Sequence, residues 1–187
     1  MSNVFSLTDE LRGMYRDVLR DPEGRVVWDA GWRKNTIVAD CRRLLAALMR
    51  GAPNALGIQG LQVGSGSDTW DQAGTMPVAS PATTKLVDPK PFTVNAAVPG
   101  ATFQMAYLMA NSSTPSNAPT NRLQIVATLG PNVPNWPKPG DHPSSTLREF
   151  GLVAQLEGQP ALVNYVIHPA IPKDPASTLE RTIWLIF

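Results

Sequence analysis

The glycine-rich segment Gly64-Ser65-Gly66-Ser67 is the first candidate for chemistry, because such segments can bind phosphate through backbone N–H groups. A phosphate-binding loop also needs a preceding strand, a following helix and a lysine that reaches the phosphates. Here Asp68-Thr69-Trp70-Asp71 follows, which supplies two carboxylates that would repel phosphate and no lysine. The pattern therefore favours a glycine turn at the end of a strand.

The two histidines of the chain, His142 and His168, are the candidates for acid–base catalysis by an imidazole. Each directly precedes a proline, which biases its backbone toward an extended or turn conformation. A general base would need a nucleophile, and the sequence shows no such arrangement. His168 closes a predicted strand and could instead be a rim or interface residue. We therefore expect no catalytic residues and no enzyme activity, and a small hydrolase ranks third among the functions considered.

Cys41 is the only cysteine, which excludes an internal disulfide and a cysteine-rich zinc site. It lies on the apolar face of a predicted helix, where a free cysteine behaves as a small core residue. Asp68 and Asp71 could bind a hard cation, although loop carboxylates more often cap turns. We expect neither a metal nor another cofactor.

Two tryptophans in predicted loops, Trp70 and Trp136, are the remaining candidates for binding. An indole in a loop can serve as a platform for a sugar or as an anchor for a partner. These residues define the alternative function, a carbohydrate- or ligand-binding β-module.

Helical periodicity appears only in the first 51 residues. Apolar residues spaced three and four apart predict a helix over Leu7–Leu19, for which Ser6 and Asp9 offer a capping box. The same spacing predicts a second helix over Ile37–Met49, which Gly51 would end.

After Gly51 the apolar period changes to two, which is typical of strands. We predict strands around Ile58–Val63, Phe103–Met109, Leu123–Leu129, Leu147–Leu156, Leu162–Ile167 and Thr178–Phe187, with a short one at Arg25–Trp28 and a connector at Gly31–Asn35. The expected fold class is α+β, mainly β: an antiparallel β-sandwich-like domain with two N-terminal α-helices and long Pro-rich loops. Residues 1–187 would form a single domain, with a helical part at 1–51 and a β part at 52–187.

Charge and hydropathy exclude several classes of partner. Sixteen basic and fifteen acidic side chains leave a net charge of +1, too weak a basic field for a nucleic-acid clamp or a polybasic membrane binder. No apolar run approaches the roughly 18 residues of a spanning helix. Asp9 and Glu10 interrupt the N-terminal apolar pattern, unlike a signal-peptide core. We expect no nucleic acid, no membrane insertion and no signal peptide.

Four short motifs in chain order give the sequence a family resemblance. They are Val63-Gly64-Ser65-Gly66, Thr84-Lys85-Leu86, Arg148-Glu149-Phe150-Gly151-Leu152 and Leu162-Val163-Asn164. The region 36–187 that contains them resembles the N-terminal attachment domain of phage tail-collar fibre proteins from contractile-tailed phages. The chain is expected to depart from that family in two ways: it stops at Phe187 where the family continues into a fibre shaft, and it carries an extra N-terminal helix, Leu7–Leu19.

The resemblance implies a non-enzymatic structural or adaptor protein of a phage tail or related contractile injection particle, serving as a tail, neck, collar or baseplate connector. The implied partners are further copies of the chain and other particle proteins, and the implied location is the virion or injection particle. From the residues themselves, Arg148 and Glu149 can pair across a turn or a subunit boundary, and Gly151 permits close approach of a second backbone.

The C-terminal strand Thr178–Phe187 is predicted to be an assembly surface as well as a core strand. Both of its faces are apolar toward the end, and an uncovered apolar edge invites pairing with another chain. The candidate interface residues are Arg148, Glu149, Trp184, Ile186 and Phe187. The alternative is that Trp184 and Ile186 pack beneath the two N-terminal helices within one subunit. Arg181 interrupts one face of the strand, so we expect it to be hydrated or paired.

Overall fold

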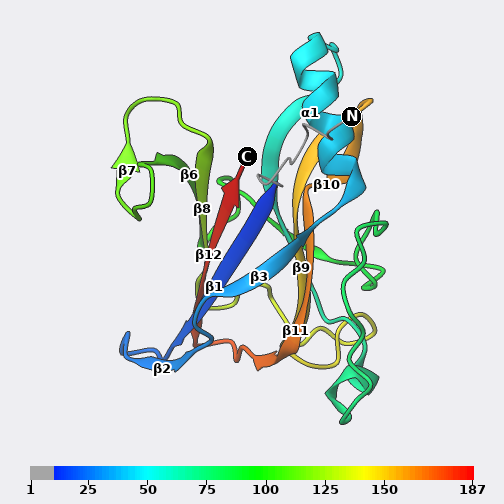
Figure 1. Cartoon of the computed structure of the whole chain (residues 1–187). Helices are drawn as coiled ribbons and strands as arrows, with labels where there is room; N and C mark the ends of the chain where they lie inside the picture. Colours follow the sequence, from blue (N-terminus) through cyan, green and yellow to red (C-terminus); the bar gives the residue numbers. More distant parts are fainter. Residues whose placement is uncertain (1–10) are drawn as a thin grey trace.

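The computed structural model describes residues 11–187, and its main feature is one antiparallel sheet of 12 strands (Figure 1). In chain order the strands are β1 (Arg12–Arg20), β2 (Val26–Asp29), β3 (Arg33–Ile37), β4 (Leu56–Gly64), β5 (Phe92–Val94), β6 (Ala101–Leu108), β7 (Pro115–Ser116), β8 (Arg122–Leu129), β9 (Thr146–Leu156), β10 (Gln159–Leu162), β11 (Asn164–Pro172) and β12 (Thr178–Ile186). The described chain also contains the helix α1 (Ala39–Arg50) and the short 3-10 helix η1 (Asp68–Asp71).

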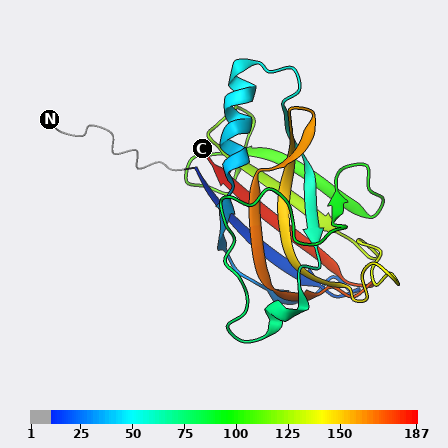
Figure 2. The same ribbon diagram turned by 90° about the vertical axis from the view of Figure 1, so that its right-hand side faces the viewer.

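The sheet curls into a half-barrel whose strands follow the order β5-β4-β9-β11-β3-β1-β12-β8-β6-β7. Strand β10 pairs with β9, and β2 pairs with β1. Strand β3 pairs with β1 through its first residues and with β11 through its last two, so it joins the two halves of the sheet (Figure 1). The main core fills the concave side, and α1 stands at one end of the sheet (Figure 2).

The predicted fold class is wrong. The structure is 47% strand and 9% helical, with one helix and a curled sheet in place of two N-terminal helices and a sandwich. The predicted first helix is contradicted from Arg12 onward, because Arg12–Arg20 is strand β1, while its capping residues Ser6 and Asp9 lie outside the described residues.

In strand β1 every second residue points into the core, but the order of apolar and polar residue types does not show this alternation. Tyr15, Asp17 and Leu19 alternate and are all buried, at 3%, 1% and 8% exposure. One of these core positions is a carboxylate, and Val18 on the other side is also buried. Because both faces of the strand carry apolar residues and one core position is an aspartate, the apolar residues fall at intervals of three and four, as they would in a helix.

The second predicted helix is confirmed, with a later start. Residues up to Ile37 belong to β3, and Gly51 ends α1 in the left-handed conformation, with φ of 70°, as predicted. The buried stripe is narrower than the apolar pattern suggests: Cys41 and Leu44 are buried, whereas Met49 is 91% exposed.

The strands predicted after Gly51 are confirmed in position as β4, β6, β8, β9 and β12, while the segment 162–167 is divided between β10 and β11. The predicted strand at 25–28 corresponds to β2. Sequence reasoning missed β1, β3, β5 and β7. Strand β3 reads Arg-Lys-Asn-Thr-Ile and is mostly polar, and β5 and β7 have only three and two residues, too few to show a period.

Candidate functional site

The four motif segments that carry the family resemblance lie together around one loop, residues 84–90, because β4 pairs with β9, Leu86 packs in one cluster with Leu162, and the Leu152 N–H donates to Asn164. We call these segments, together with the side chains that hydrogen-bond to them or to the loop, the motif cluster. Glu149 on β9 is fully buried and accepts hydrogen bonds from the N–H groups of Val87 (3.0 Å) and Asp88 (2.7 Å). The hydroxyl of Tyr165 on β11 donates to the same carboxylate over 2.5 Å. Burial and this hydrogen bond raise the pKa of Tyr165 above its ordinary value, so the phenol remains a donor.

Arg148, the neighbour of Glu149 in the sequence, binds a different part of the chain. Its Nε and Nη2 atoms donate to the two carboxylate oxygens of Asp71 in η1, over 2.9 and 2.6 Å, and its Nη1 donates to the carbonyl of Ser65 over 3.0 Å. This bidentate pair lowers the pKa of Asp71. Successive residues of a strand face opposite sides, which is why Arg148 and Glu149 bind separate partners within the subunit.

Asp88 connects the turn after β4 to a distant histidine. Its Oδ2 accepts from the N–H of Ser65 (2.8 Å), the Ser65 hydroxyl (3.0 Å) and Nε2 of His142 (2.9 Å), and its Oδ1 accepts from the N–H of Lys90 (2.8 Å). Burial alone would raise the pKa of Asp88, but these hydrogen bonds outweigh it and hold the pKa below the ordinary value. The Ser65 N–H that a phosphate would need is occupied by a carboxylate, in agreement with the predicted glycine turn.

Small residues allow the motif cluster to pack closely. A side chain at Gly64 would begin 2.7 Å from Oε1 of Glu149, and one at Gly66 would begin 2.4 Å from the ring of Trp70. At Gly151 the nearest atom would be the backbone carbonyl oxygen of Asn164, at 2.6 Å. The close backbone approach predicted at Gly151 is therefore present.

The loop tryptophans are less available for ligands than the sequence suggested. Trp136 is 5% exposed and stacks on His142, with ring centroids 3.7 Å apart and an interplanar angle of 17°. Trp70 is half-buried against Gly66. The stacking of Trp136 on His142 leaves little of its ring face for a sugar, while Trp70 is partly covered where it packs against Gly66.

A second buried polar group lies in the main core. Arg181 on β12 and Asp17 on β1 are 0% and 1% exposed, and they form a bidentate ion pair with distances of 2.6 and 2.8 Å. The guanidinium also stacks on Phe150, at 3.7 Å, and its Nη2 lies 3.1 Å from Nε2 of His168. Arg181 is therefore paired, one of the two outcomes that the sequence left open, and His168 is a core residue rather than a rim residue.

Lys173, just after β11, is a buried cation that sequence reasoning missed. It is 3% exposed, and its Nζ donates to the carbonyls of Gly130 (2.9 Å) and Ser177 (3.0 Å). Burial lowers the pKa of Lys173 to about 8. Two acceptors supplied by separate loops indicate a structural role in joining those loops.

Cys41 is 2% exposed, and burial raises the pKa of its thiol to about 11, as fits a core residue. Asp71 is committed to Arg148, which weakens the cation-binding interpretation of Asp68 and Asp71. Over the part of the chain that the structure describes, no three or more metal-ligating side chains gather in one place.

The candidate interface residues of the C-terminal strand lie on the convex face of the sheet or at its end. β12 pairs with β1 on one side and β8 on the other, so it is an interior strand and has no free edge for another chain. The rings of Trp184 and Trp32 are 4.2 Å apart, the Arg122 guanidinium lies 5.4 Å from the Trp184 ring, and the indole N–H donates to Gln124 over 2.9 Å. Trp184 and Ile186 are half-buried, and Phe187 is 41% exposed.

The alternative in which Trp184 and Ile186 pack beneath two N-terminal helices is wrong for the described residues, because Arg12–Arg20 is a strand beside them. Trp32 covers Trp184 instead, and Trp32 itself is 38% exposed. The convex face therefore offers a partly exposed aromatic pair, which we call the tryptophan pair.

Over residues 11–187, no helix is both long and apolar enough to cross a membrane. No family model, curated protein or solved structure matches the chain. The resemblance to the attachment domain therefore stays a prediction, and function has to be inferred from the geometry of this chain.

Proposed function

We propose that this protein is a non-enzymatic structural or adaptor protein of a phage tail or related contractile injection particle. It associates with further copies of itself through the convex face of the β1–β12–β8 region. The observation that carries the proposal is the tryptophan pair. Trp32, just before β3, remains 38% exposed and rests on Trp184 of the interior strand β12. Partly exposed tryptophans beside an arginine are typical of the residues that dominate binding at protein interfaces.

The motif cluster supports the same proposal. Arg148, Glu149 and Asp88 use their charged groups to hold backbone N–H groups, a carbonyl and neighbouring side chains in place. These hydrogen bonds hold the loop 84–90 against the sheet and favour a rigid building unit. The segments that suggest the attachment domain thus lie together in space, as expected of residues that define a common fold.

The alternative function as a carbohydrate-binding module is less favoured. A sugar platform needs an exposed indole face, whereas Trp136 is 5% exposed and stacked on His142.

Sedimentation of the purified protein tests self-association. We expect wild type to form oligomers and Trp32→Ser to remain folded, as judged by circular dichroism, and to become monomeric. Met49→Ser is the matched control, because it also removes an apolar side chain, one that is 91% exposed and belongs to α1 rather than to the sheet. A monomeric wild type, or a Trp32→Ser variant that assembles normally, would contradict the proposed interface.

Mass spectrometry of purified particles from the source of the gene tests the location. The chain should be present in tails or injection particles at a fixed ratio to other components. Its absence from them would overturn the particle assignment while leaving the self-association result unaffected.

A further inference from the structure

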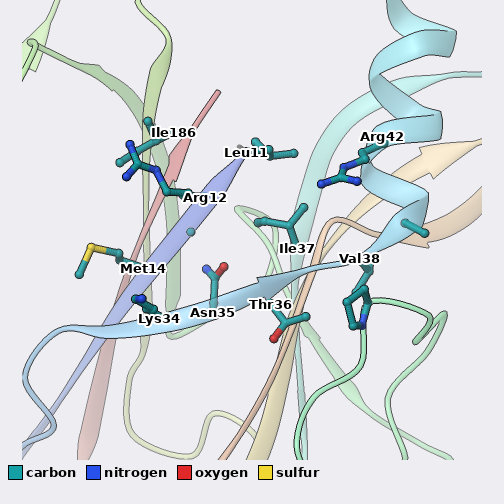
Figure 3. A pocket seen from close by; sticks show the side chains of 13 residues that line it. Leu11, Arg12, Met14, Lys34, Asn35, Thr36, Ile37, Val38, Arg42 and Ile186 are labelled. Carbon is teal, nitrogen blue, oxygen red and sulfur yellow. The ribbon is translucent and has the colours of Figure 1, made fainter. Parts of the chain in front are cut away.

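A pocket of about 680 Å³ opens where β1 and β3 diverge. The two strands pair only at Gly13–Tyr15 with Arg33–Asn35, after which β3 turns away to pair with β11. Figure 3 shows the resulting wedge, with α1 along one side. A volume of several hundred Å³ is in the range of small-molecule sites.

Among residues 11–187, the charged groups that line this pocket all have one sign. Arg12, Lys34 and Arg42 line it, and no carboxylate of the described residues does. None of the ion pairs within residues 11–187 uses any of these three cations. In Figure 3 the Arg42 side chain points from α1 toward Leu11 and Ile37, while Arg12 and Lys34 lie on the opposite side. The pocket therefore favours an anion.

Asn35 supplies an independent indication of a ligand. Both polar atoms of its side chain are buried and have no hydrogen-bond partner among the described residues. Figure 3 places this amide between the two diverging strands. A glycine at position 13 makes room for it, because a Cβ atom there would lie only 1.8 Å from Oδ1 of Asn35. Buried amides are normally hydrogen-bonded, so an unpartnered one at a pocket marks a position for a polar group.

Apart from Thr36, the remaining walls of the pocket are apolar. They include Leu11, Ile37, Val38 and Ile186. An inorganic ion would leave these side chains unused, whereas an anion with an apolar body would cover them.

We propose that the wedge between β1 and β3 binds an organic carboxylate that has an apolar body. Its carboxylate pairs with Arg42. The Asn35 side chain turns from its buried position over Gly13, so that Nδ2 donates to that carboxylate and Oδ1 accepts from a hydroxyl of the ligand or from water. Its apolar body lies against Leu11 and Ile37. This site is separate from the tryptophan pair and does not depend on the proposed particle function.

Three probes separate the charge from the apolar body: octanoate carries both, acetate the charge alone and 1-octanol the body alone. NMR titration of the ¹⁵N-labelled full chain should give a Kd below about 1 mM for octanoate and much weaker binding for the other two. The shifted amides should include Gly13, Asn35 and Ile37. Added salt should weaken the binding of octanoate, because the three cations are exposed.

Two variants and one matched control test which side chains bind the carboxylate of octanoate. Arg42→Gln should weaken octanoate binding by about tenfold or more, whereas Arg50→Gln, an exposed arginine of the same helix outside the pocket, should leave it unchanged. Asn35→Ala should weaken binding without lowering the melting temperature, because it removes an unpartnered polar group. The proposal is overturned if octanoate does not bind, if 1-octanol binds equally well, if the shifts lie elsewhere, or if Arg42→Gln and Arg50→Gln behave alike.

Discussion

Arg181 donates a hydrogen bond from Nη2 to Nε2 of His168 over 3.1 Å, in the interior of the half-barrel. The other ring nitrogen of His168, Nδ1, lies 2.8 Å from the carbonyl oxygen of Pro169 and donates to it. One nitrogen accepts and the other donates, so these partners select the neutral imidazole in a single tautomer. The histidine thus supplies an additional acceptor to a buried arginine whose carboxylate partner is Asp17.

This arrangement predicts a pH dependence of stability. Burial, followed by the charge of Arg181, lowers the pKa of His168 from 6.5 to about 4. Between these values the unfolded chain binds a proton that the folded chain does not, so stability falls as the pH is lowered from about 6.5 to about 4. The loss attributable to His168 is about 3 kcal/mol across that window.

Urea unfolding at several pH values measures this loss. His168→Gln keeps an acceptor for Arg181 but cannot titrate, so its free energy of unfolding should fall less over the same window. Parallel pH profiles for wild type and His168→Gln would show that His168 is not neutral and buried as described.

Gly151 predicts a large effect of a single methyl group. Gly151→Ala should lower the free energy of unfolding by about 1–3 kcal/mol, because its Cβ would lie 2.6 Å from a backbone oxygen of Asn164 that cannot move freely. Gly57→Ala in the neighbouring strand β4 is the control, since nothing lies within 4 Å of a Cβ there. Equal melting temperatures for the two variants would contradict the packing of β9 against β11.

Helix α1 predicts a graded response along its length. Leu44→Ala should cost about 2–5 kcal/mol, because Leu44 is 4% exposed and packs in the main core. Leu45→Ala should lower the free energy of unfolding by less, because Leu45 is half-buried. Met49→Ala should change it by no more than about 0.5 kcal/mol, because Met49 is 91% exposed. Chemical denaturation of the three variants measures the order, and a loss at Met49 as large as at Leu44 would mean that the helix buries a different face.

Several elements were predictable from the sequence because neighbouring residues encode them. The apolar period of two marks β8 and β12, and the glycine after Arg50 marks the end of α1. Strand β1 was not predictable in this way, because its core position 17 carries a charge whose partner is 164 residues away. A local pattern cannot distinguish a solvated carboxylate from one that a distant arginine neutralises.

The candidate sites, like the strands, were only partly predictable from neighbouring residues. The sequence drew attention to Arg148, Glu149 and Trp184, but it assigned the first two to each other or to a subunit boundary. Only the order of strands in the sheet decides their partners: Asp71 lies 77 residues before Arg148, and Trp32 lies far from Trp184 in the chain. The pocket at Asn35 arises in the same way, from the divergence of two strands that the sequence presents as a connector and a helix.

The sequence by itself determines which segments can extend and where the chain turns, because those preferences depend on adjacent residues. The tertiary structure decides which charges are paired and which surfaces stay open, because those depend on contacts that sheet curvature creates between distant segments.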